Sequence, residues 1–244
     1  MKIFKESLNP SKILVMGFAI LILVGAFLLT FPVATADGKG LPFLDALFTA
    51  TSATCVTGLV VVDTEEAFSL FGELVILSLI QIGGLGFMTF ATFLFTLLGK
   101  KISLKERILL KEAFNAASTL DIVKIVKRIL IFTVIVEGIG AIILSIRFSF
   151  DMTIGKAIYF GFFHSISIFN NAGFDLMGGF KSLTEYVDDP FVVLTVCSLI
   201  IIGGLGFIVI HELYEYPVTH KISLHSKVVL FTTLMLIVGA TILI

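Results

Sequence analysis

The chain has 244 residues, of which 57% are hydrophobic and 14% are charged, and its mean hydropathy is +1.10. This composition excludes an ordinary soluble domain and predicts that a lipid bilayer is the main solvent. The net charge of -1 comes without a basic tract, which argues against a nucleic-acid partner.

Five apolar runs are long enough to cross a bilayer as helices, because about 30 Å of hydrocarbon requires about 20 residues. In chain order they cover residues 13–31, 70–98, 122–146, 191–214 and 228–244. We therefore predict an all-α membrane protein with five spans. The two cysteines, Cys55 and Cys197, lie in or beside these runs and are interpreted as free thiols in a packed interior.

Two shorter apolar segments, 41–53 and 153–168, lie between the first and second spans and between the third and fourth. Each is too short to cross, so we predict that each enters the membrane and returns. This topology places 13 of the 17 Lys and Arg residues on one face and leaves four on the other: Lys39, Arg147, Lys156 and Lys181. Because positive charge favours the cytoplasmic side, we predict a multi-pass protein of the cell membrane with a cytoplasmic N-terminus.

The chain contains an internal repeat. The sequence QIGGLGF at 81–87 recurs as IIGGLGF at 201–207, and KISL at 101–104 recurs at 221–224, both 120 residues apart (201 − 81 and 221 − 101). Two coincidences at one spacing indicate duplication. We predict a first helix/pore-loop/helix repeat over 1–120, a second over 121–225 and the first helix of an incomplete third over 226–244. This arrangement is of the potassium-channel type.

The glycine-rich motifs have two interpretations. A nucleotide-binding loop is disfavoured because no strand precedes either motif. Close packing of helices through small residues is the better interpretation, and it would let these helices approach the loops.

The loops after the two short segments are the candidate functional site. They align 115 residues apart, so that Ser52 pairs with Ser167 and Gly58 with Gly173 (173 − 58). Non-helical backbone at membrane depth must be buried in protein or line a watery cavity, and rings of backbone oxygens can replace the hydration shell of a cation. The two glycines supply the positive φ that such a backbone requires. The predicted filter residues are Thr54, Cys55, Val56, Thr57 and Gly58 in the first loop and Asn170, Asn171, Ala172, Gly173 and Phe174 in the second.

Two further expectations concern the surroundings of these loops. The short helices would direct their partly negative C-terminal ends at the cation. Glu137 lies within the third span, where a carboxylate is a candidate functional group. The alternative is a carboxylate satisfied by a neighbouring helix or loop, and our preferred version is structural support behind the second filter. Nothing in the sequence forms a Ser/His/Asp or Cys/His catalytic set, so we predict that the chain is not an enzyme.

The sequence TSATCVTGL at 51–59, FNNAGFD at 169–175 and the two GGLGF motifs together resemble the membrane subunit of the Trk/Ktr/HKT potassium transporter superfamily, in its KtrB type. The resemblance implies K+ as the transported ion, with Na+ as a second candidate, and no bound cofactor. It also implies a membrane homodimer and a cytoplasmic ring of RCK-type nucleotide-binding domains as regulator.

The chain departs from that family in its number of repeats. Members carry four repeats around one pore, whereas this chain has two and the opening helix of a third. Either another half completes the four pore loops or a second copy does. Two alternative functions stay open, a secondary cation-coupled transporter with a closed site at the midplane and a non-conducting half of a longer or split transporter.

Overall fold

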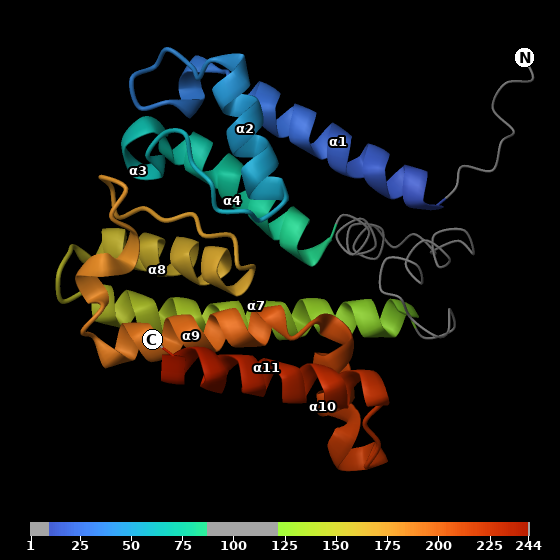
Figure 1. Cartoon of the computed structure of the whole chain (residues 1–244). Helices are drawn as coiled ribbons and strands as arrows, with labels where there is room; N and C mark the ends of the chain where they lie inside the picture. The colour runs from blue at the N-terminus through green and yellow to red at the C-terminus, as the bar shows by residue number, and fades with distance from the viewer. Residues whose placement is uncertain (1–9, 87–121, 244) are drawn as a thin grey trace, which may run out of the picture.

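The computed structural model describes residues 10–86 and 122–243, and these are mostly helical (Figure 1). Within these two ranges the structure has no strand, only an isolated antiparallel bridge between Thr35 and Phe68. The predicted all-α membrane fold is confirmed. The helices are α1 (Pro10–Leu29), α2 (Phe43–Thr54), α3 (Thr64–Ala67), α4 (Leu70–Leu85), α7 (Ile122–Phe148), α8 (Ile154–Phe169), α9 (Pro190–Gly204), α10 (Phe207–Thr219) and α11 (Leu224–Leu243), with 3-10 turns η1 (Pro32–Ala34) and η2 (Ser182–Tyr186).

Three helices, α1, α7 and α11, are long and apolar enough to span a membrane, and they match the first, third and fifth predicted spans. The predicted span over 191–214 is apolar and long enough to cross, but it is not one continuous helix. Helix α9 ends at Gly204 and α10 begins at Phe207, with a bend of 96° between them. Gly206 has a φ of +85°, and a residue in this region cannot continue a right-handed helix.

The predicted span over 70–98 is described only as far as Gly86. Helix α4 stops at Leu85, and Gly86 has a φ of +82°. Residues 87–98 of that prediction lie outside the described residues, as do the KISL sequence at 101–104 and the predicted repeat boundary at 120. The division into repeats therefore stays a prediction. Gly86 and Gly206 occupy the same place in the two glycine-rich motifs, and both have a positive φ within two residues of the end of a helix.

The short re-entrant segments form helices close to their predicted bounds. Helix α2 contacts α1 and α4, helix α8 contacts α7 and α9, and α4 contacts α8 between the two groups (Figure 1). Alanines at every third or fourth position of α2 are fully buried, namely Ala46, Ala50 and Ala53. Small residues of this kind let helices approach closely. The outward face of α1 exposes Val15, Leu23 and Phe27, as a lipid-facing surface requires.

Candidate functional site

Each short helix is followed by a turn that contains the same backbone hydrogen bond. After α2, the N–H of Thr57 donates to the carbonyl oxygen of Ser52 at 2.9 Å. After α8, the N–H of Ala172 donates to the carbonyl oxygen of Ser167 at 2.8 Å. Donor and acceptor are both shifted by 115 residues, the register predicted from the sequence. The two loops therefore begin in the same conformation.

The serine side chains close both loops in the same way. The Ser52 hydroxyl donates to the carbonyl oxygen of Leu59 at 2.7 Å, and the Ser167 hydroxyl donates to that of Phe174 at 2.6 Å. Both serines are buried. Leu59 and Phe174 thus hold equivalent places, although the predicted filter included only Phe174. Phe174 closes the second loop as Leu59 closes the first, and its place in the filter stays a prediction.

Positive φ angles recur at matching places in the loops. Val56 and Asn171 have φ of 50° and 57°, and Gly58 and Gly173 each have a φ of 74°. A β-branched residue such as Val56 rarely adopts this conformation. Strained backbone of this kind concentrates at functional sites, where the surrounding structure maintains it.

The two loops meet at their glycines. A Cβ atom at Gly58 would lie 2.8 Å from the carbonyl oxygen of Ala172 and 3.3 Å from the Cα atom of Gly173. A Cβ atom at Gly173 would lie 3.1 Å from the Cα atom of Gly58. No side chain larger than hydrogen fits between them without displacing backbone. The fold thus places two glycines from distant parts of the chain in direct contact.

The glycine-rich motifs support the loops from behind. A Cβ atom at Gly83 would lie 2.0 Å from the carbonyl oxygen of Thr54, and one at Gly203 would lie 1.8 Å from that of Phe169. Thr54 and Phe169 are the last residues of α2 and α8. The predicted close approach of these motifs to the loops is therefore confirmed, and its target is the end of each short helix.

The predicted site residues do not all face the same way. The Thr54 hydroxyl is buried and has no hydrogen-bond partner among the described residues. Cys55 and Cys197 are free thiols, but both are exposed, so the predicted packed interior is wrong for them. The Thr57 hydroxyl donates to the Ser52 hydroxyl at 2.9 Å, within its own loop.

The side chain of Asn170 is turned back among the helices. Its amide nitrogen lies 3.3 Å from a carboxylate oxygen of Glu137 and 3.0 Å from the side-chain oxygen of Gln81. Asn171 likewise directs its amide nitrogen to the Ile200 carbonyl oxygen at 3.5 Å. Gln81 was not among the predicted site residues. Its signal in the sequence is a lone amide, two residues before the Gly83-Gly84 pair of an apolar helix.

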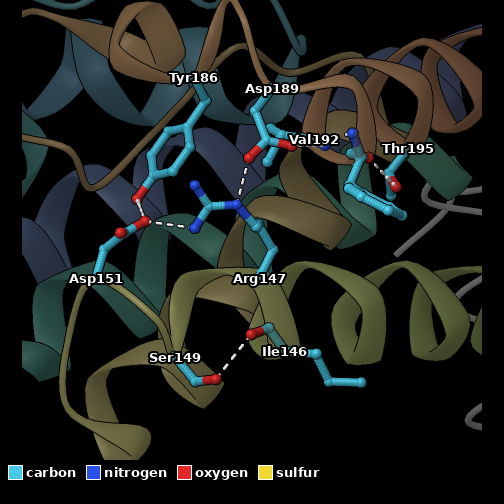
Figure 2. A network of polar contacts seen from close by, with 9 residues as sticks. Ile146, Arg147, Ser149, Asp151, Tyr186, Asp189, Val192 and Thr195 are labelled. Atoms are coloured by element: carbon cyan, nitrogen blue, oxygen red, sulfur yellow. Dashed lines mark hydrogen bonds and ion pairs between the residues drawn. The ribbon is translucent and has the colours of Figure 1, made fainter.

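An ion-pair network joins the end of α7 to the start of α9 (Figure 2). Arg147, at the end of α7, pairs with Asp189 and donates to Asp151 at 2.6 Å. Tyr186 donates its hydroxyl to Asp151 at 3.1 Å, and its ring centre lies 5.3 Å from the Arg147 guanidinium carbon. Asp189 also caps α9 by accepting from the N–H of Val192 at 3.2 Å. These contacts hold the end of α7 to the start of α9, the helices that precede and follow α8 in the chain.

Side chains that bind metal ions are not clustered in the described parts of the chain. Within 10–86 and 122–243, no three His, Cys, Asp or Glu residues are grouped so that they could hold a metal ion.

Comparison with known proteins places the chain in a family. A family model for TrkH, described as a cation transport protein, matches residues 2–244. The chain belongs to the TrkH family. It is 44% identical over 239 residues to the potassium/sodium uptake protein NtpJ of Enterococcus hirae, covering 98% of this chain and 52% of the relative.

Two further relatives carry the name Ktr system potassium uptake protein B. The chain is 47% identical to the Bacillus subtilis protein over 228 residues, covering 93% of this chain and 50% of the relative. It is 40% identical to the Vibrio alginolyticus protein over 234 residues, covering 95% and 50%. The chain spans about half the length of these curated TrkH-family relatives.

Proposed function

We propose that this chain forms part of a K+ pathway across the cell membrane, lined by backbone carbonyls of residues 54–58 and 170–174. The observation that carries the proposal is the contact between Gly58 and Gly173 within two loops of matching hydrogen bonds and φ angles. K+ crossing hydrocarbon needs oxygens in place of its hydration shell. Relatives named as potassium uptake proteins support K+ as the ion, and the name of the E. hirae relative adds Na+ as a second ion.

The short helices contribute electrostatically to this pathway. Helices α2 and α8 end at Thr54 and Phe169, immediately before the two loops. The C-terminal end of a helix carries partial negative charge, which stabilises a nearby cation. The effect is strongest where water is excluded, as at the depth of these loops.

The two loops supply only part of a fourfold ion site. We infer that further loops come from another half of the protein or from a second copy of this chain. The distribution of Lys and Arg supports a cytoplasmic N-terminus. The resemblance to the KtrB type implies a homodimer regulated by a cytoplasmic RCK-type ring, and the word "system" in the relatives' names supports an assembly of several components.

Rb+ uptake into proteoliposomes containing the full gene product tests this function. We expect uptake driven by an inside-negative potential, inhibited by K+ more strongly than by Na+. Uptake that requires an inward Na+ gradient would favour the cation-coupled alternative. Absence of uptake would overturn the proposed function. The same assay on the 244-residue chain alone distinguishes two copies that complete a pore from a non-conducting half.

A further inference from the structure

Three polar side chains meet behind the second loop, each from a different helix or helix end. Asn170 directs its amide nitrogen to the side-chain oxygen of Gln81 at 3.0 Å and to a carboxylate oxygen of Glu137 at 3.3 Å. The amide nitrogen of Gln81 donates to the other carboxylate oxygen of Glu137 at 3.3 Å. Every one of the three side chains thus contacts both others, and the hydrogen bonds form a closed ring.

Two members of this ring are buried and Gln81 is half-buried, so water has limited access to its bonds. Asn170 and Glu137 expose only 9% and 7% of their surface. The Asn170 amide nitrogen has two hydrogens but three acceptors within 3.3 Å, the third being the Ile166 carbonyl oxygen at 2.9 Å. Buried polar groups that lose a partner are costly. The orientation of Asn170 is therefore tightly specified by Gln81 and Glu137.

Helix α4 is shaped to hold Asn170. A Cβ atom at Gly84 would lie 2.1 Å from the side-chain oxygen of Asn170, and one at Gly83 would lie 2.0 Å from the carbonyl oxygen of Thr54. Consecutive glycines on one helix thus touch the ends of both short helices. Gln81, three residues before Gly84, adds a hydrogen bond to Asn170 and none to Thr54. Helix α4 is the element that sets the two loops relative to each other.

The two loops differ in this support. Asn170 corresponds to Cys55 in the first loop, and Gln81 corresponds to Ile201 in the second motif. Cys55 is exposed, and the side chain of Ile201 has no hydrogen-bonding group. Asn170 is also the C-cap residue of α8, and Asn171 and Gly173, with their positive φ, follow it in the loop. A shift of Asn170 therefore moves the second loop.

We propose that Gln81, Asn170 and Glu137 form a positioning network that sets the second loop against the first and so determines how well the pathway discriminates K+ from Na+. This inference rests on the proposed function. Discrimination between ions of different size depends on where the coordinating oxygens lie. Gln81, which does not belong to either loop, is thereby a specificity-determining residue.

An exchange of charge and amide tests the network. Gln81→Glu alone removes the amide that donates to Glu137 and leaves two carboxylates facing each other. Glu137→Gln alone, with its oxygen accepting from Asn170, leaves the amide nitrogens of residues 81 and 137 facing each other with no acceptor between them. In the double variant the carboxylate at position 81 accepts one hydrogen bond from Asn170 and one from the amide nitrogen at position 137. The amide oxygen at position 137 accepts the remaining hydrogen bond from Asn170. All three bonds are restored in the double variant. Ser78→Ala is the matched control on α4, because Ser78 is exposed and bonds only to its own helix, at the Leu74 carbonyl oxygen.

The readout is the ratio of K+ to Na+ inhibition of Rb+ uptake by the full gene product, at equal amounts of folded protein. We expect each single variant to lower the ratio about tenfold, as a lost buried bond implies, and the double variant to return to within about twofold to threefold of the wild type. Ser78→Ala should leave the ratio unchanged. Additive losses in the double variant, or single variants with an unchanged ratio, would overturn the proposal.

Failure of the proposed function gives a different result. In that case the wild type itself takes up no Rb+, whatever the variants do. The ring of hydrogen bonds is then tested by the thermal unfolding midpoints, in detergent, of the wild type, the two single variants and the double variant. Recovery of the midpoint in the double variant would support the ring of bonds, although not its role in selectivity. Additive decreases would contradict it.

Discussion

The carbonyl oxygen of Thr54 lies 2.0 Å from the position that a Cβ atom of Gly83 would occupy. The end of the first short helix therefore rests directly on the backbone of α4, and Gly203 makes the equivalent contact with Phe169 at 1.8 Å. Contacts this close leave no room even for a methyl group. The glycine-rich motifs thus determine how deeply the two short helices are seated.

We predict that Gly83→Ala and Gly203→Ala each destabilise the protein by about 1–3 kcal/mol, the usual cost of overpacking. The obstacle is backbone, which cannot rotate away as a side chain can. Thermal unfolding in detergent measures the effect. Gly138→Ala on α7 is the control, because a Cβ atom there has nothing within 4 Å. Equal midpoints for Gly83→Ala and Gly138→Ala would contradict the packing described.

The serine bond that closes the second loop should matter for stability and for transport. Ser167→Ala removes the donor to Phe174 and leaves a buried carbonyl unpaired, at a cost of about 1–3 kcal/mol. We expect a lower unfolding midpoint and slower Rb+ uptake. Ser198→Ala is a matched control, since Ser198 is exposed and bonds only to the Leu194 carbonyl oxygen of its own helix. Indistinguishable variants would show that the bond does not maintain the loop.

The ion-pair network between α7 and α9 predicts a dependence of stability on pH (Figure 2). Burial acts to raise the pKa of Asp189, but hydrogen bonds from Arg147 and from the Val192 N–H outweigh it and hold the pKa below its usual value of 3.8. A lowered pKa stabilises the folded protein above pH 3.8, and this contribution is lost as pH falls through the folded pKa. Arg147→Gln should therefore lower the unfolding midpoint by several degrees at neutral pH, and by progressively less as the pH approaches 3. A difference that is constant over this range would contradict the assignment.

Cys55 provides a native probe of the first loop. It is exposed at the end of α2, within the proposed pathway, whereas Cys197 lies on α9. We expect a small cationic thiol reagent to reduce Rb+ uptake by the wild type and by Cys197→Ala but not by Cys55→Ala. Inhibition that persists in Cys55→Ala and disappears in Cys197→Ala would place the sensitive thiol outside the pathway.

The sequence predicted the local conformation of the loops well. Two serines and two glycines at one spacing were enough to align them, because a positive φ and a closing side-chain bond are each tied to a residue type. Hydropathy was less informative about helix ends. The apolar runs continue through Gly86 and Gly206, and nothing in their hydrophobicity indicates that these residues have positive φ next to helix ends.

The network behind the second loop could not be predicted as a whole. Glu137 was noted because a carboxylate within a membrane span is rare, but its partners were not. Gln81 is 56 residues from Glu137 and 89 from Asn170 along the chain. Only the packing of α4 against α8 brings these side chains together, and a single sequence does not encode that contact in any local pattern.

The most direct test of the pathway is Rb+ uptake, with K+ and Na+ as competitors, by Gly58→Val and Gly173→Val in the full gene product. A side chain at a φ of 74° costs roughly 1–2 kcal/mol in backbone strain alone, and here it also meets the opposite loop. We predict loss of uptake, or a fall of about tenfold in the preference for K+ over Na+, with Gly138→Val unaffected at equal protein amounts. Unchanged uptake and preference in both loop variants would contradict the assignment of these loops to the ion pathway.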